Sequence, residues 1–217
     1  MRTRAVLILS SALLSAAPLA WSIPSGSLDD GSNSSAPQAA PSAQDKTTYS
    51  AALALIKKGD ELDAQHTDHD GARDAYASAR AKLQALIARS PQIAEAWNAL
   101  GYTQRKLGSY DDSLASYAKA LELKPGYPEA LEYRGEAYLR LNRIHDAKQA
   151  YLDLFASNRR IAATLLASMK EWLKTQQGSH AVDASVITDL QQWVQERSQI
   201  ATQTAALTRA GAAASWR

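Results

Sequence analysis

The sequence AEAWNALGYTQRKLGSYDDSLASYAKALELKP, residues 94–125, recurs with substitutions 34 residues further along the chain. The paired positions are Trp97 and Leu131, Gly101 and Gly135, Leu107 and Leu141, Asp112 and Asp146, and Tyr117 and Tyr151. A repeat of this length, with aromatic, glycine and proline residues at fixed places, is typical of stacked helical hairpins. We therefore expect an all-α fold, built as a short α-solenoid of hairpins.

Each unit also carries the signals that start and stop a pair of helices. Gly101 has no Cβ, so the two helices of a hairpin can approach closely there. Gly108 is placed to end the first helix. Asp111 and Asp112 open the second helix, where the helix dipole favours negative charge. Pro125 then interrupts the chain before the next hairpin.

These positions resemble the signature of the tetratricopeptide repeat family. The matching residues are Trp97, Leu100, Gly101, Tyr117, Ala120 and Pro125. Ser113 and Gln104 stand where the family usually has alanine and tyrosine. The resemblance implies one repeat at residues 92–125 and a second at 126–159, and it extends to small exported bacterial proteins of this family. It also implies a binding scaffold and no enzymatic activity.

An earlier, degenerate hairpin is expected at residues 47–91. Pro91, Tyr76 and Ile87 each lie 34 residues before a matching residue, so residues 72–89 are interpreted as its second helix. The apolar segment that would supply the first helix comes too early for the repeat. The sequence therefore predicts an inserted loop at about residues 60–71, because loops tolerate insertions.

Residues 160–203 are expected to form capping helices that cover the open end of the stack. Ile161, Leu165 and Met169 recur at helical spacing, and so do Ile187, Leu190 and Val194. A repeat stack needs such caps because each hairpin leaves an apolar face uncovered. Residues 204–217 are alanine-rich and weakly patterned, so we expect a fraying tail. Self-association through an end helix is a further expectation, since fewer than three full repeats make a small stack.

The first 22 residues, MRTRAVLILSSALLSAAPLAWS, have the layout of a secretory signal peptide. Two arginines precede a short apolar run, and small residues follow at Ala20 and Ser22. The alternative is an uncleaved membrane anchor, although the apolar run is shorter than the roughly 20 residues of a spanning helix. Residues 23–46 are rich in Ser, Pro and Ala, which predicts a flexible linker. An exported, periplasmic or secreted, protein is the expectation.

Composition narrows the classes of function. The chain has no cysteine, which excludes disulfides and thiol catalysis. Without Arg2 and Arg4, 22 basic residues face 22 acidic ones, and they are interspersed. A nucleic-acid partner is not expected, because such proteins show a basic stripe. The chain also lacks the motifs of nucleophilic catalysis, nucleotide binding and zinc proteases, so we expect no cofactor.

A weak metal-binding candidate lies in the predicted insertion. His66, His69 and Asp70 carry side chains that bind divalent ions. Their spacing matches no established metal site, and a solvated acidic loop is the simpler interpretation.

The predicted binding surface is the concave face of the stack, which the first helix of each hairpin lines. Outward positions recur there every three or four residues. They are Glu95, Asn98, Tyr102 and Arg105 in one repeat, and Glu129, Glu132, Glu136 and Leu139 in the next. Some family members hold a peptide's terminal carboxylate with lysine and asparagine. Glu132 and Tyr102 stand at such positions here, so we do not expect a carboxylate ligand.

The function expected from these features is a non-catalytic scaffold of the cell envelope that binds a partner peptide or protein on this concave face. The alternative is a membrane-anchored structural component of a secretion or surface assembly, which requires the N-terminal segment to stay uncleaved. A third reading is a metal-responsive protein that uses His66 and His69. The identity of the partner is beyond the sequence.

Overall fold

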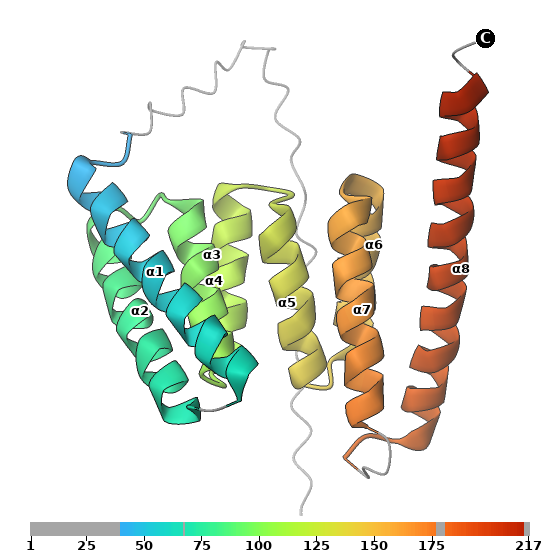
Figure 1. Cartoon of the computed structure of the whole chain (residues 1–217), viewed down its shortest axis with the longest axis horizontal. Helices are drawn as coiled ribbons and strands as arrows, with labels where there is room; N and C mark the ends of the chain where they lie inside the picture. Colours follow the sequence, from blue (N-terminus) through green and yellow to red (C-terminus); the bar gives the residue numbers. More distant parts are fainter. Residues whose placement is uncertain (1–39, 67, 177–180, 215–217) are drawn as a thin grey trace, which may run out of the picture. The chain divides into compact units, whose positions relative to one another are not determined.

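The computed structural model describes residues 40–66, 68–176 and 181–214, with side chains described as far as residue 207. These residues form eight α-helices and no strand, which confirms the all-α prediction. The helices are α1 (Ala43–Gln65), α2 (His69–Arg89), α3 (Ala94–Lys106), α4 (Tyr110–Leu123), α5 (Pro128–Arg140), α6 (Ile144–Ser157), α7 (Arg159–Thr175) and α8 (Ala184–Ala214). Figure 1 shows them following one another in the order of the chain.

Helices α1 to α6 pair into three hairpins, α1–α2, α3–α4 and α5–α6. Each pair is joined by three residues, at 66–68, 107–109 and 141–143. In the second link Gly108 has a φ of +80°, a left-handed conformation that glycine adopts without strain. Asn142 takes the equivalent place in the third link with a φ of +56°. Asparagine tolerates this conformation better than most residues.

A glycine packed on a tyrosine ring sets the spacing inside the first two hairpins. A Cβ at Gly101 would lie 2.6 Å from a ring carbon of Tyr117, and a Cβ at Gly59 would lie 2.7 Å from a ring carbon of Tyr76. Both tyrosine rings are buried. The missing side chain thus leaves room for an aromatic ring between the helices.

This packing corrects the prediction of an insertion at residues 60–71. Residues 60–65 belong to α1 and residues 69–71 to α2, so the link is as short as in the other hairpins. The extra residues lie at the opposite end of the hairpin. Gly59 is the seventeenth residue of α1, whereas Gly101 is the eighth of α3, and α2 has 21 residues where α4 has 14. The first hairpin is therefore a regular unit lengthened by about two turns at its open end.

At its lengthened end, α1 begins at Ala43, within the segment that the sequence analysis assigned to the linker, residues 23–46. Ser42 caps α1, accepting a hydrogen bond from the Asp45 backbone N–H at 3.1 Å, while the Asp45 carboxylate accepts from the Ser42 backbone N–H at 3.2 Å. This reciprocal capping box satisfies backbone donors that a helix start leaves unpaired. Asp45 also accepts a hydrogen bond from the Ser90 hydroxyl at 2.9 Å, which ties the start of α1 to the end of α2.

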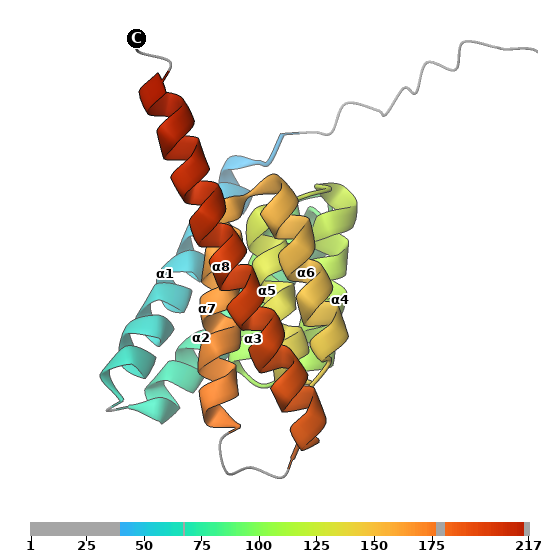
Figure 2. The ribbon, with the colours of Figure 1, turned by 90° about the vertical axis from the view of Figure 1, so that its right-hand side faces the viewer.

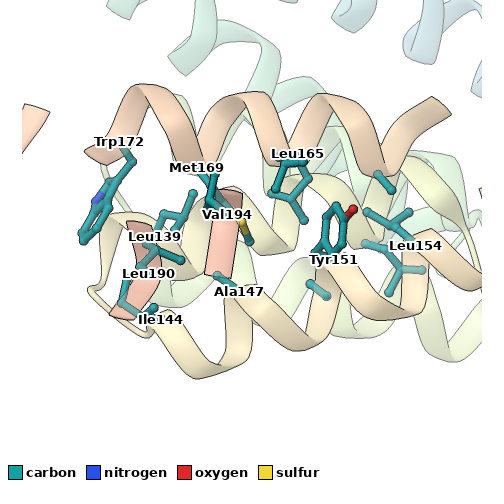
Figure 3. Packing of buried hydrophobic residues seen from close by; sticks show 14 of the residues in the cluster. Leu139, Ile144, Ala147, Tyr151, Leu154, Leu165, Met169, Trp172, Leu190 and Val194 are labelled. Carbon is teal, nitrogen blue, oxygen red and sulfur yellow. The ribbon is translucent and has the colours of Figure 1, made fainter. Parts of the chain in front are cut away.

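The largest buried cluster lies among α5, α6, α7 and the first part of α8. Figure 3 shows its side chains, with Leu165 and Met169 of α7 pointing towards α6 and with Trp172 at one edge. Leu190 and Val194 of α8 complete the cluster. The apolar positions expected to cap the stack at residues 160–203 are thus the ones that pack on the last hairpin.

Helix α8 extends well beyond this cluster. Its 31 residues run to Ala214, so the part of the predicted tail up to that residue is helical and continuous with the cap. Alanine has the highest helix propensity, which explains why a weakly patterned sequence continues the helix. Among the described residues of α8, the last buried one is Val194. Figure 2 shows the C-terminal part of α8 continuing past α6 and α7.

Within the described ranges, no helix is both long enough and apolar enough to cross a lipid bilayer. The predicted signal segment at residues 1–22 and most of the predicted linker at 23–46 lie outside the described residues.

Candidate functional site

The predicted concave-face residues come from α3 and α5, and they differ in exposure. Glu95, Tyr102, Arg105, Glu129 and Glu136 are partly exposed, as expected for residues lining a surface. Asn98, Glu132 and Leu139 are buried.

Arg105 is the centre of a polar network that joins α3, α5 and α7. Its Nη1 lies 2.8 Å from Oε2 of Glu136, and Oε1 of Glu136 accepts a hydrogen bond of 2.6 Å from the Ser168 hydroxyl. The guanidinium also lies 5.1 Å from the ring centre of Tyr102 and 5.6 Å from that of Tyr133. Burial alone would lower the pKa of Arg105, but the Glu136 carboxylate outweighs it and raises that pKa. The network holds Arg105 charged and fixed in place.

Tyr102 is held from two sides, so both its ring and its hydroxyl are engaged within the protein. Its ring meets Tyr133 edge to face at 5.1 Å between ring centres. Its hydroxyl donates to Oδ1 of Asp60 at 2.7 Å. Burial, and next the Asp60 carboxylate, raise the pKa of this hydroxyl, which therefore stays protonated.

The Asp60 contact belongs to a second network, which attaches the first hairpin to α3. The Tyr76 hydroxyl lies 2.7 Å from Oδ1 of Asp60 and 3.0 Å from Oδ2 of Asp63. Lys106 of α3 places its Nζ 2.6 Å from Asp63 Oδ2. Burial opposes ionisation of Asp63, but the hydrogen bonds from Lys106 and Tyr76 outweigh this effect and lower the pKa of Asp63.

Three residues correct the prediction of an outward-facing set. Leu139 belongs to the buried apolar cluster of α5 to α8. Asn98 and Glu132 are each 8% exposed. Oδ1 of Asn98 has no hydrogen-bond partner, and neither an ion pair nor a hydrogen bond to a described residue holds Glu132. Both side chains are therefore buried rather than exposed on the predicted surface.

Burial raises the pKa of Glu132 to about 7, and the like charge of Glu136 adds to the effect. Arg105 opposes the shift, Glu129 adds to it, and Arg160 of α7 opposes it. The folded protein therefore favours the neutral form of the Glu132 carboxyl more than solvent does.

Glu95 and Glu129 lie near the starts of α3 and α5, and the charge of each acts on Tyr127. Glu95 pairs with Lys124 at 2.9 Å, and the Lys124 ammonium lies 4.4 Å from the ring centre of Tyr127. Burial raises the pKa of Tyr127 to about 12, with further contributions from Tyr49, Glu95 and Glu129, while the Asn98 side chain opposes the shift. This end of the face thus combines carboxylates with aromatic rings.

A cleft of about 300 Å³ opens between α5 and α7, beside the Arg105 network. Its walls include Arg105, Glu136 and Ser168, with Thr164 and Ala167 from the exposed side of α7. The cleft combines fixed polar groups with small side chains.

The metal candidates do not come together as a site. The rings of His66 and His69 have centres 6.4 Å apart, and His69 and Asp70 are both exposed in the first turn of α2. Within the described residues, no group of three histidine or acidic side chains is placed to hold a metal ion.

Sequence reasoning missed Tyr133, Ser168 and the pair Asp60 and Asp63. Tyr133 could have been found, since it lies four residues after Glu129 and three before Glu136, on the same face of a helix. No sequence signal would have found Ser168 or the aspartates, because they reach the face from other helices.

Two comparisons bear on this arrangement. A model of the tetratricopeptide repeat family matches residues 64–128, from the end of α1 to the start of α5. The chain is similar to "Tetratricopeptide repeat domain-containing protein PYG7, chloroplastic" from Arabidopsis thaliana, with 28% identity over 116 residues. That match covers 51% of this chain and 38% of the relative, so the chain spans well under two thirds of that protein. Taken with the three hairpins, these matches support tetratricopeptide repeats in the matched part of the chain, residues 64–128.

Proposed function

We propose that this protein is a non-catalytic scaffold that binds a segment of a partner protein on the face formed by α3, α5 and α7. Tetratricopeptide repeats generally mediate protein–protein interaction. The observation that carries the choice of face is the cleft beside the Arg105–Glu136–Ser168 network. Its polar groups are already fixed by one another, so a partner would not have to order them on binding.

The cellular setting forms part of the proposal. The signal-like residues 1–22 support export to the cell envelope, where the partner would be found. N-terminal sequencing of the protein from its native cells tests this point. A mature chain that starts near Trp21 or Ile23 is the expected result, whereas an intact Met1 would contradict cleavage.

The binding face can be tested by site-specific photo-cross-linking in native extracts. A photoreactive residue at Ala167, on the exposed side of α7 that lines the cleft, should yield adducts with a partner protein. The matched control is the same residue at Ala115, which is exposed on α4 and outside the cleft. Adducts from Ala115 alone, or none from either position, would overturn the proposal.

A further inference from the structure

We propose that the groove between the C-terminal part of α8 and the junction of α6 and α7 is a second docking site, which binds an acidic and apolar segment of a partner protein. The groove has a volume of about 490 Å³. The described residues that line it all differ from those of the cleft beside the Arg105 network. The inference therefore goes beyond the proposed function and does not depend on it.

The first argument is the shape of this end of the stack. Trp193 of α8 meets Tyr151 of α6 edge to face, with ring centres 5.2 Å apart, so the two helices are in contact there. Further along α8, the residues that line the groove are the small ones Ala201 and Ala205, one helical turn apart. Phe155 of α6, stacked on Tyr151, adds an aromatic ring to the lining. An apolar channel thus remains where α8 carries no large side chain.

The groove is within reach of a partner. The lining residues Arg159, Arg160, Ala163 and Ala205 are exposed, and Phe155 is partly exposed. A segment of another chain can therefore contact both the apolar and the charged part of the lining without displacing any helix.

The second argument is the charge of the groove. Among the described residues that line it, Arg159 and Arg160 alone are charged. Neither forms an ion pair with a described residue. The Arg159 guanidinium lies 5.6 Å from the ring centre of Phe155, and Arg160 attracts Glu132 without pairing with it. An aspartate or glutamate from a partner would supply the missing charge, because guanidinium groups bind carboxylates by charged hydrogen bonds.

The third argument is that the free protein gains little from these two arginines. Arg159 and Arg160 lie in the first turn of α7, which the structure describes in full and which contains no acidic residue. The helix dipole makes this end positive, so cations are unfavourable there. A bound carboxylate would offset both the two guanidinium charges and the positive end of the helix.

Tyr151 adds a hydrogen-bond donor to the lining. It lines the groove although it is only 1% exposed. Its hydroxyl forms no hydrogen bond with a described residue, whereas buried polar groups are nearly always paired. Burial raises the pKa of this hydroxyl, and the charge of Arg197 opposes the shift. The hydroxyl therefore stays protonated and is available to donate to an acceptor.

The test uses the full chain and the blocked hexapeptide acetyl-Leu-Glu-Leu-Phe-Glu-Leu-amide, titrated by calorimetry at pH 7. We expect Arg160→Gln to weaken binding about tenfold, because one charged hydrogen bond is lost. Ala205→Gln should weaken it by a similar factor, because the longer side chain occupies the groove while glutamine still favours the helix. The matched control Arg73→Gln, at an exposed arginine of α2 outside the groove, should change affinity by less than about twofold.

Altered peptides separate the two parts of the lining without changing the protein. A peptide with glutamine in place of both glutamates should bind at least about tenfold more weakly, because it loses the charges that face the arginines. A peptide with serine in place of the leucines and phenylalanine should bind as weakly, because the apolar contact is lost.

Three results would overturn the inference. The first is the absence of binding by the acidic peptide. The second is an equal loss of affinity in Arg160→Gln and Arg73→Gln, which would indicate attraction to basic surface in general. The third concerns the occupant, and light scattering of the unaltered protein and of Ala205→Gln measures it. A dimer that Ala205→Gln dissociates would show that a second copy of the chain covers the groove, whereas equal masses for the two proteins support a partner segment.

Discussion

The first hairpin, α1–α2, and the second, α3–α4, are the same packing unit at two lengths. The buried residues Ala72, Ala75, Tyr76 and Ala79 of α2 correspond to Ser113, Ser116, Tyr117 and Ala120 of α4, 41 residues later. Gly59 and Gly101 take the same place against these tyrosines. The difference teaches that this fold lengthens a hairpin at its open end, while the short link and the glycine–tyrosine contact beside it stay fixed.

The largest expected effect comes from filling the space that the two hairpins share. Gly101→Ala should destabilise the protein by about 2–3 kcal/mol, because the new methyl group collides with the buried Tyr117 ring. Gly59→Ala should cost a similar amount if the hairpins are equivalent. Urea unfolding followed by circular dichroism measures both. The double variant Gly101→Ala/Tyr117→Leu should recover part of the lost stability. If Gly59→Ala left the stability unchanged, the first two hairpins would not be equivalent.

The two tyrosines should differ once the hydroxyl alone is removed. Tyr76→Phe should cost about 2 kcal/mol, because Asp60 and Asp63 lose the donor between them. Tyr117→Phe should cost less, since its hydroxyl meets no carboxylate and only interacts with the Arg105 guanidinium, without a well-aligned hydrogen bond. Equal costs for the two variants in chemical denaturation would show that their surroundings are alike.

The third hairpin, α5–α6, extends the comparison, because Glu132 occupies the position that Asn98 has in the second. The pKa of Glu132 is raised when the protein folds, so its contribution to stability is present below its ordinary pKa and is lost as the pH rises through about 7. Glu132→Gln should therefore stabilise the protein by about 1–2 kcal/mol at pH 8 and change little at pH 5. Thermal unfolding at both values measures this, and an unchanged pH profile would contradict the burial of a charge at Glu132.

The smallest effect concerns the lengthened end of α1. Ser42→Ala should cost about 1 kcal/mol, because it removes the capping hydrogen bond to Asp45. The matched control is Ser109→Ala, since Ser109 precedes α4 without a side-chain capping bond and its loss should cost less. Hydrogen exchange at the amides of the first turn of α1 would localise the effect, and protection equal to that of the unaltered chain would show that the cap is dispensable.

The sequence predicted the second and third hairpins correctly but misaligned the first one. The reason lies in helix geometry. The apparent match of Tyr76 to Tyr110 is wrong by seven residues, since Tyr76 packs as Tyr117 does. Seven residues are almost two turns of an α-helix, so such a shift leaves apolar residues on the same face and keeps the pattern convincing. Only the contact with Gly59, across the hairpin, distinguishes the two alignments.

The face was predicted in outline but not in its internal pairing. Helical spacing grouped Tyr102, Arg105 and Glu136, and the structure brings these three side chains together. It could not show that Arg105 pairs with Glu136 or that Tyr102 bonds to Asp60, because these contacts join helices distant in sequence. Burial of Asn98 and Glu132 likewise depends on the overlap of neighbouring helices, which the pattern of one helix does not contain.

The Tyr76 hydroxyl has one hydrogen and faces two carboxylates, and this has a mechanical consequence. Only one of Asp60 and Asp63 can receive that hydrogen at a time, and the Tyr102 hydroxyl and the Lys106 ammonium supply the other contacts of the two carboxylates. The joint between the first hairpin and α3 is therefore ionic at this end, whereas Leu83, Leu86 and Leu100 make its other end apolar. Salt weakens the ionic end by screening and leaves the apolar end closed. As ionic strength rises, we expect the first hairpin to separate from α3 at the ionic end of their contact and to stay packed at the apolar end.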